Sequence, residues 1–269
     1  MMSIKVDSSG RRWVRGEVEV PGSVEEVWRA ISTEGGLSAW FTRSEFPEGA
    51  DGKPTHLICY FGPGISSAAK ITKWDAPRGF SVISDEFIPG GPEVSTDWKI
   101  SEGADGTCLL SVEHSLFVDT DEYDNYVEGT EAGWPAFFRI LQIYMSHHRG
   151  QPCALIEVMG AAADGAQAWS ELATALGFAG VEKGERFAAP PGKLRISGVV
   201  DTVPDETEVI LHVEEPTGGV AHLFVWPLND QILLSIRFYL YGEDAAEVVS
   251  LEEPAWRSWM EERFPSSQG

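Results

Sequence analysis

His114 is the residue whose type and position most directly suggest chemistry. Leu110, Val112, His114 and Leu116 alternate along one predicted strand, so they share a face and place an imidazole toward the interior. An imidazole there suits general acid–base catalysis, because its ordinary pKa lies near neutral pH. The alternative is a neutral histidine that is hydrogen-bonded within the core, which is the commoner state of a buried histidine. The sequence leaves both interpretations open.

The other reactive side chains lack the spacing of known catalytic or metal sites. His56 would join His114 only if the strand over residues 55–61 is in phase, and this segment is apolar on both faces. Two histidines without a third ligand do not make a metal site, so we expect no metal. A nucleophile elbow, a phosphate-binding loop and a dinucleotide fingerprint are all absent from the sequence, which predicts no cofactor.

An acidic run precedes the longest apolar helix pattern. It lacks the glycine and the final glutamate of a calcium-binding loop, so we expect an exposed loop over residues 119–128. The three cysteines are far apart and have no Cys-x-x-Cys spacing, which predicts reduced core residues; they are Cys59, Cys108 and Cys153.

A long buried helix is predicted over residues 133–149. Apolar residues recur there at helical spacing, and the positive end 147–149 complements the helix dipole. Before it, a strand over 14–20 leads into a helix with a Ser23–Glu26 capping box. A short helix over 37–41 follows, and then strands are predicted at 55–61, 65–74, 80–87, 94–101 and 107–116. This order predicts an α+β fold, with a curved antiparallel sheet around the helix.

The order begins again after residue 150, which predicts an internal duplication. A strand near 154–158 precedes a helix with the N-cap Asp164 and the C-cap Gly177. Strands are then expected at 194–203, 208–214, 221–226 and 231–241. A final helix carries Trp256, Trp259, Met260 and Phe264. We therefore predict two domains, 1–150 and 151–269.

The sequence resembles one known family in the order and spacing of four features. They are the opening strand, the segment 23–28, the Trp40–Phe41 pair and the Gly133–Trp134 step. This is the bacterial family similar to the activator of the ninety-kilodalton heat-shock protein's ATPase, within the SRPBCC or START-like helix-grip superfamily. The resemblance covers about residues 13–150, and the second half is similar to a divergent, smaller copy. It implies a seven-stranded sheet that curls around the C-terminal helix and leaves a cavity for an apolar ligand.

The candidate ligand-binding residues are those that this cavity would bring together, mostly aromatic side chains with a few polar groups. They are Trp40, Phe41, Tyr60, Trp98, His114, Trp134, Phe137, Phe138, Leu141 and Tyr144. Each of them would also serve as ordinary core packing. The second half has no Trp–Phe pair, and its final helix is predicted to be shorter, so we expect the functional pocket in the first domain and a more nearly filled second one.

The charge of the chain limits its partners. A formal net charge of −22 disfavours nucleic acid and anionic lipid surfaces. The sequence has no signal peptide and no run of 18 apolar residues, so a soluble cytoplasmic protein without a membrane partner is expected.

Three functions remain open from the sequence. The first is binding of a small hydrophobic or aromatic molecule in the first domain. The second is a cyclase-like or hydrolase-like enzyme that acts on such a ligand. The third is a protein-interaction module with a filled core, associated with a chaperone or with itself.

Overall fold

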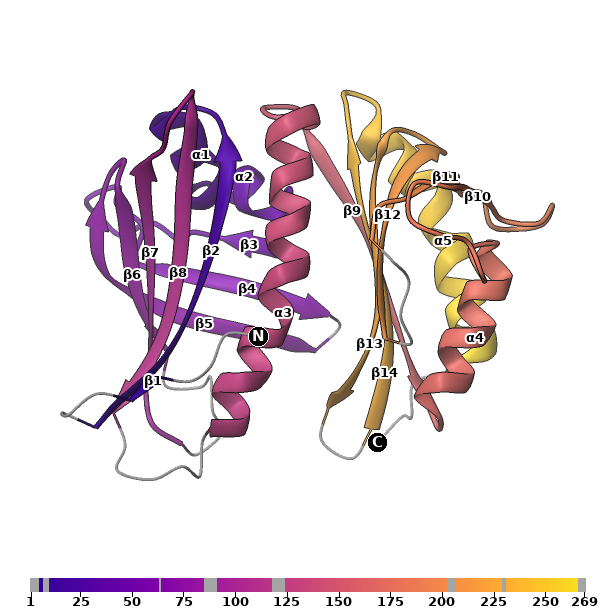
Figure 1. The fold of residues 1–269 in the computed structure, drawn as a ribbon, viewed down its shortest axis with the longest axis horizontal. Coiled ribbons are helices and arrows are strands. Elements are labelled where there is room, and N and C mark those ends of the chain that lie inside the picture. The colour runs from indigo at the N-terminus through magenta and orange to yellow at the C-terminus, as the bar shows by residue number, and fades with distance from the viewer. Residues whose placement is uncertain are drawn as a thin grey trace. The chain divides into compact units, whose positions relative to one another are not determined.

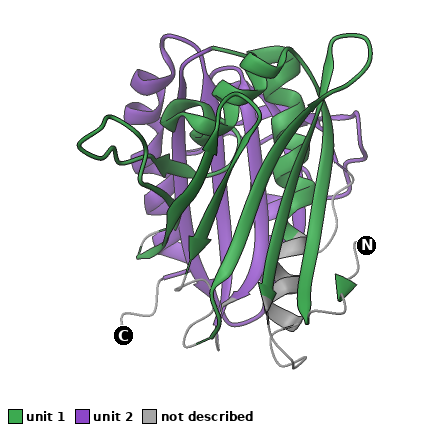
Figure 2. Ribbon diagram, turned by 90° about the vertical axis from the view of Figure 1, so that its left-hand side faces the viewer, with its two compact units in different colours: residues 1–150 green, residues 151–269 purple. Residues whose placement is uncertain are grey.

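The chain divides into two compact units, residues 1–150 and 151–269 (Figure 2). The computed structural model describes residues 5–6, 10–62, 64–84, 91–117, 124–202, 207–228 and 231–265. For residues 117, 124–132 and 228 it describes the backbone alone. None of the described helices is both long and apolar enough to cross a membrane.

The first unit is an antiparallel sheet with a long helix along one face (Figure 1). Its elements are β1 (Lys5–Val6), β2 (Arg11–Pro21), α1 (Val24–Ser32), α2 (Glu34–Ser38), β3 (Arg43–Glu45), β4 (His56–Gly62), β5 (Ile65–Asp75), β6 (Gly79–Ser84), β7 (Val94–Glu102), β8 (Thr107–Phe117), α3 (Asp124–Ile143) and the π-helical turn η1 (Tyr144–His148). The strand order is β1-β2-β8-β7-β6-β5-β4-β3, so the first long strand pairs with the last. The sheet therefore has eight strands, one more than the resemblance implies.

The second unit repeats this order with fewer strands. Its elements are β9 (Cys153–Ala162), α4 (Gly165–Leu176), β10 (Arg186–Ala188), β11 (Ser197–Val200), β12 (Glu208–Glu215), β13 (Gly219–Leu228), β14 (Gln231–Tyr241) and α5 (Ala245–Arg263). The strand order β10-β11-β12-β13-β14-β9 again pairs the first strand with the last. Residues of both α4 and α5 belong to one core cluster with the sheet. The predicted α+β class, with two antiparallel helix-grip copies, is confirmed.

The structure contains the helix caps that the sequence predicts. Ser23 accepts a hydrogen bond from Glu26 N, and the Glu26 carboxylate accepts one from Ser23 N, which completes the capping box of α1. Asp164 caps α4 through a 2.9 Å bond from Gln167 N. Gly177 ends α4 at φ 77°, in the left-handed region where glycine is favoured.

The predicted start of the long helix in the first unit is wrong. Helix α3 begins at Asp124, so the expected loop over 119–128 ends at the helix, and its residues 119–123 lie outside the described ones. Helix α5 has 19 residues against 20 in α3, although η1 prolongs α3 by a further five. The apolar periodicity of α3 starts late, because its first residues are mostly acidic and polar, and acidic residues stabilise a helix N-terminus without forming a stripe.

Several predicted limits elsewhere are also wrong. The short strands β1, β3 and β10 were not expected, because two or three residues are too few to show alternation. The second short helix, predicted over 37–41, is α2 at Glu34–Ser38. The strand predicted over 194–203 is only β11, Ser197–Val200. The strand predicted over 80–87 is described as far as Ser84, and its remaining residues lie outside the described ranges.

Candidate functional site

A group of aromatic side chains lies between the sheet of the first unit and α3. We call it the aromatic cluster: Trp40, Phe41, Phe61, Phe80, Trp98, Trp134, Phe137 and Phe138. Six of these eight residues were candidates from the sequence. Their neighbouring ring centroids lie 4.6–6.2 Å apart in the contacts that link them, within the range in which aromatic pairs attract one another.

Phe41 and Trp134 form the centre of the aromatic cluster. Their rings stack with centroids 5.3 Å apart and an interplanar angle of 4°. Phe137 meets Phe41 edge-on at 4.6 Å, and Phe138 stacks on Trp134 at 5.1 Å. The helix supplies residues 134, 137 and 138 because positions three and four apart lie on one face.

The Trp40–Phe41 pair follows α2 and turns both rings inward. Trp40 is fully buried and Phe41 nearly so. Trp40 Nε1 donates a 2.9 Å hydrogen bond to the carbonyl oxygen of Ala30 in α1, which fixes the indole. Adjacent residues can both reach the interior here because they lie in the turn after α2 rather than within a strand.

Trp98 and His114 come from the central strands β7 and β8. Trp98 lies 5.4 Å from Trp134 and stacks on Phe80 at 5.5 Å. His114 pairs with Thr96 across the two strands, and its ring lies 5.7 Å from that of Trp134. Since strand residues two apart share a face, Thr96 and Trp98 both face the interior, where both are buried.

The hydrogen bonds of His114 define its chemical state. Trp134 Nε1 donates to His114 Nε2 over 2.9 Å, so this nitrogen is the acceptor of a neutral ring. Nδ1 therefore carries the proton and donates to Thr96 Oγ1 at 2.8 Å. Burial lowers the pKa of His114 from 6.5 to about 4. His114 is thus an uncharged, hydrogen-bonded core residue at neutral pH. This agrees with the interpretation as a core histidine rather than with the interpretation as an acid–base catalyst.

Four other sequence candidates lie outside the aromatic cluster. The half-buried Tyr60 has its ring under the Arg43 guanidinium, 4.0 Å from the centroid. Tyr144 lies in η1, and its hydroxyl oxygen accepts a 3.3 Å bond from Gly150 N. Leu141 is fully buried, one turn along α3 from Phe138. His56 is exposed and bonds to Thr55 at 3.0 Å, so it does not join His114.

Sequence reasoning missed Phe61 and Phe80. Phe61 lies 5.9 Å from Phe41, and Phe80 also contacts Trp74 at 5.4 Å, which extends the aromatic contacts toward α1. Phe61 follows Tyr60 in an apolar strand whose phase a register shift between Tyr60 and Gly62 conceals. Phe80 carries a usable signal, since Phe80 and Val82 alternate directly after the Pro77–Gly79 turn.

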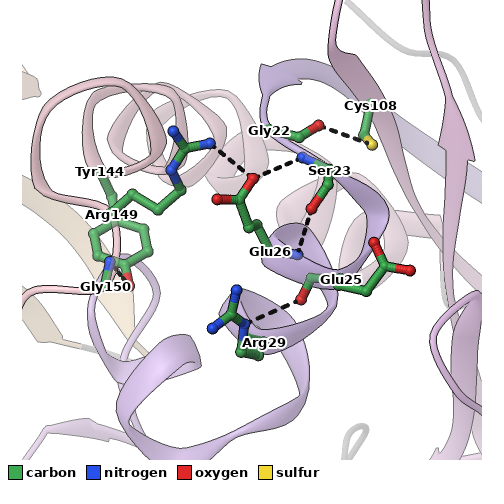
Figure 3. A network of polar contacts seen from close by, with 9 residues as sticks. All are labelled: Gly22, Ser23, Glu25, Glu26, Arg29, Cys108, Tyr144, Arg149 and Gly150. Carbon is green, nitrogen blue, oxygen red and sulfur yellow. Dashed lines mark hydrogen bonds and ion pairs between the residues drawn. The ribbon is translucent and has the colours of Figure 1, made fainter.

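A polar network joins the start of α1 to the chain just after η1 (Figure 3). The Glu26 carboxylate accepts a 2.8 Å bond from Ser23 N and pairs with the Arg149 guanidinium at 3.0 Å. The backbone bond from Ser23 is the main cause that lowers the pKa of Glu26, and Arg149 adds to it. Gly22 has φ 132°, a conformation that favours glycine, and a Cβ there would lie 2.8 Å from Arg149 Nη1, so the guanidinium would have to shift.

The three cysteines carry free thiols. Cys59 and Cys108 are buried, and Cys153 is half-buried. Burial raises the pKa of Cys59 and of Cys153 to about 12, so both are protonated at neutral pH. This state fits the predicted reduced core residues and not a nucleophile.

The interior of the second unit is built mainly from aliphatic side chains. Trp256 lies 4.7 Å from Phe238, and Trp259 lies 5.8 Å from Phe264, but these are separate pairs. Trp226 is only half-buried, and its Nε1 donates a 3.1 Å hydrogen bond to Ser235 Oγ. An open groove on this unit's surface is polar instead; it is lined by Gln167, Ser170, Glu171, Thr174, Ala175 and Arg263.

The first unit matches a known family. Residues 21–146 match the family described as "Activator of Hsp90 ATPase homolog 1-like protein". This match confirms the resemblance seen in the sequence. No curated protein matches the chain in sequence.

The chain is similar to several solved structures at low sequence identity. CalU16 from Micromonospora echinospora is 16% identical over 54% of this chain and 81% of its own, with a TM-score of 0.41. DynU16, described as a putative protein in the dynemicin biosynthetic locus, is 19% identical over 92% and 95%, with a TM-score of 0.42. The di-domain ARO/CYC BexL from the BE-7585A biosynthetic pathway is 10% identical over 93% of each chain, with a TM-score of 0.44.

Proposed function

We propose that the N-terminal unit binds a small apolar or aromatic molecule between its curved sheet and α3, in contact with the aromatic cluster. The observation that carries this proposal is the collection of eight aromatic side chains in one interior. Aromatic walls with a few placed polar groups are typical of small-molecule sites. The family of this unit supports a ligand-binding or cyclase-like role in general.

The half-buried rings give the proposed site a side that a ligand can reach. Phe137 and Phe61 are both half-buried, and both contact the central ring of Phe41. At Gly133, one turn before Phe137, an added Cβ would meet only the Phe137 ring, at 4.0 Å, among the described atoms. A flat ligand would therefore enter beside Phe137 and stack on the rings behind it.

The geometry supports binding more than catalysis by His114. A general base needs a free lone pair at the reacting atom, and His114 Nε2 already accepts a hydrogen bond from Trp134. The lowered pKa also leaves the ring with little tendency to take up a proton at neutral pH. Cys59 and Cys153, whose pKa values burial raises to about 12, are equally poor nucleophiles. We therefore assign His114 a positioning role toward Trp134.

The proposal also assigns different roles to the two units. The second unit holds isolated aromatic pairs within an aliphatic core, so it offers less aromatic surface to a ligand. We propose that it acts as a structural partner, as its divergence from the first unit suggests. The ligand, any reaction and any chaperone association are matters for experiment.

The test compares filling the two interiors. The probe is N-phenyl-1-naphthylamine, a neutral aromatic molecule whose fluorescence rises in apolar surroundings. Wild-type protein should bind it, Leu141→Trp should abolish binding, and Met260→Trp should leave it unchanged, because Leu141 and Met260 are both buried but in different units. Circular dichroism verifies that each variant is folded.

A milder variant keeps the test valid if Leu141→Trp does not fold. Phe137→Ala removes a half-buried ring from the expected edge of the site and should weaken probe binding several-fold. Loss of binding in Met260→Trp with binding kept in Leu141→Trp would show that the wrong unit was chosen. A wild-type protein that binds no probe, and yields no small molecule by mass spectrometry after purification, would favour the interaction module with a filled core.

A further inference from the structure

The three indoles of the aromatic cluster differ in their hydrogen bonds. Trp40 Nε1 donates to Ala30 O, and Trp134 Nε1 donates to His114 Nε2, each over 2.9 Å. Trp98 is only 2% exposed, yet within the described part of the chain no atom accepts a hydrogen bond from its Nε1. A buried donor without an acceptor is destabilising and rare, so this one requires an explanation.

The surroundings of Trp98 explain why the protein itself supplies no acceptor. The indole stacks on Phe80 at 5.5 Å with an interplanar angle of 13°, and it meets Trp134 edge-to-face at 5.4 Å. Trp40 and Phe41 lie 6.2 and 6.3 Å from it. Rings of this kind have no lone pair to offer an N–H donor. A molecule bound among the rings could supply the acceptor that Trp98 lacks.

We propose that Trp98 Nε1 donates a hydrogen bond to an oxygen acceptor, such as a ketone or quinone carbonyl, on a planar aromatic ligand in the aromatic cluster. This inference rests on the proposed function and deepens it by naming the class of ligand, an oxygenated polycyclic aromatic molecule. The stacked rings recognise the flat surface of the ligand, and Trp98 distinguishes it from a hydrocarbon of the same shape. A site with a buried donor rejects an analogue that lacks the matching acceptor, because the donor is then left unpaired.

The other two indoles cannot take this role without losing an existing bond. Trp134 would have to release His114, whose Nε2 would then lie buried without its donor. Trp40 would have to release Ala30 O, and it is already fully buried against α1. Trp98 alone among these three would gain a bond at no cost to another, which makes it the specificity-determining residue of the proposed site.

The experiment measures the affinities of 9-fluorenone and fluorene, which differ by one carbonyl group. The measured quantity is the ratio of the two affinities, so the general loss of ring surface in a variant cancels. Trp98→Phe should lower the fluorenone-to-fluorene affinity ratio about three- to tenfold, as expected for one buried neutral hydrogen bond. Fluorene should still bind to this variant.

Two matched tryptophan variants serve as controls. Trp40→Phe removes an indole N–H that is already bonded to Ala30 O, so it should leave the affinity ratio unchanged. Trp256→Phe removes another buried indole whose Nε1 has no acceptor in the described structure, but in the second unit, and it should also leave the ratio unchanged. A fall of the ratio in Trp256→Phe alone would overturn the assignment to Trp98.

Wild-type spectra keep the inference testable if Trp98→Phe does not fold. The carbonyl stretch of bound fluorenone should shift to lower frequency than in an apolar solvent, and the indole proton of Trp98 should move downfield with fluorenone but not with fluorene. An unshifted carbonyl, or an unchanged ratio in a folded Trp98→Phe variant that binds both molecules, would overturn this inference and leave the proposed function standing. Failure of wild-type protein to bind either molecule would overturn both.

Discussion

The two units share an order of elements but differ in how their interiors are filled. In the first unit, eight aromatic residues form one connected set between the sheet and α3. In the second, the equivalent space holds an aliphatic core with isolated aromatic pairs. The same helix-grip arrangement is therefore stabilised in two ways, and the difference suggests which unit interacts with ligands.

The difference continues in the polar groups of the two interiors. The first unit buries His114 with both ring nitrogens hydrogen-bonded to neutral partners, Thr96 and Trp134. The second buries His222 with Nε2 2.7 Å from the Glu208 carboxylate. A neutral network among aromatic rings is compatible with an apolar ligand, because no charge has to be desolvated when the ligand binds.

The largest expected effect comes from removing the central indole of the first unit. Trp134→Leu should lower the free energy of unfolding by about 3–5 kcal/mol, because a buried ring is lost. Trp256→Leu is the matched change in the second unit and should cost about 1–3 kcal/mol less, since Trp256 donates no hydrogen bond to a described residue. Urea unfolding measures both. Equal losses would show that the connected aromatic set adds nothing beyond ordinary packing.

The second effect is a pH dependence that originates at His114. Its folded pKa, about 4, lies below the unfolded value of 6.5, so between these pH values the unfolded chain binds a proton that the folded protein does not. Stability is therefore full above pH 6.5 and should fall by roughly 3 kcal/mol as the pH drops to 4. His114→Gln should flatten this slope in urea titrations at stepped pH.

His222→Gln is the comparison for the second unit. Burial lowers the pKa of His222, but the hydrogen bond that its ring makes to the Glu208 carboxylate opposes this change. His222→Gln should therefore reduce the dependence of the free energy of unfolding on pH less than His114→Gln does. A larger effect at His222 than at His114 would contradict the contrast between a neutral and a charge-paired histidine.

The sequence predicted the elements of the fold better than their limits. The capping box of α1, and the Asp164 N-cap and Gly177 C-cap of α4, depend on neighbouring residues, so they could be predicted locally. The start of α3 could not, because its first residues are mostly polar and a helix continues through polar residues once tertiary packing holds its apolar part.

The site was predictable by residue type more than by contact. Trp40, Phe41, Trp98 and Trp134 were identified because a helix-grip fold has a single interior. Tyr60 lies outside the aromatic cluster, and the sequence could not show this because the segment that forms β4 is apolar on both faces. The orphaned N–H of Trp98 had no sequence signal, since hydrogen bonding between distant strands and helices depends on the folded geometry.

The smallest expected effect on stability comes from the N-terminal caps of α1 and α4, which differ in charge. Glu26→Gln removes the charge that bonds Ser23 N and pairs with Arg149, and it should cost about 0.5–1 kcal/mol at neutral pH. The pKa of the Glu26 carboxyl group is lowered in the folded state. The stability difference between wild type and Glu26→Gln should therefore disappear as the pH falls through this lowered pKa and the wild-type carboxyl group protonates. Thermal unfolding at pH 7 and at pH 3 measures it.

The reverse change tests the same interaction in the second unit. Gln167 occupies the position in α4 that Glu26 occupies in α1. Gln167→Glu should stabilise the protein by about 0.3–1 kcal/mol at neutral pH, because it places a negative charge at the helix N-terminus. Stabilisation that persists below the pKa of a carboxyl group would indicate a cause other than charge.

Nitrogen-edited NMR of the indole groups tests the central claim most directly. The ten tryptophans should give ten indole signals, assigned through single Trp→Phe variants and followed as 9-fluorenone is added. The account predicts that the largest shifts occur at Trp98 and Trp134 in the first unit, while Trp256 and Trp259 in the second unit stay unchanged. Shifts confined to Trp256 and Trp259, or no shift at a ligand concentration that saturates binding, would contradict it.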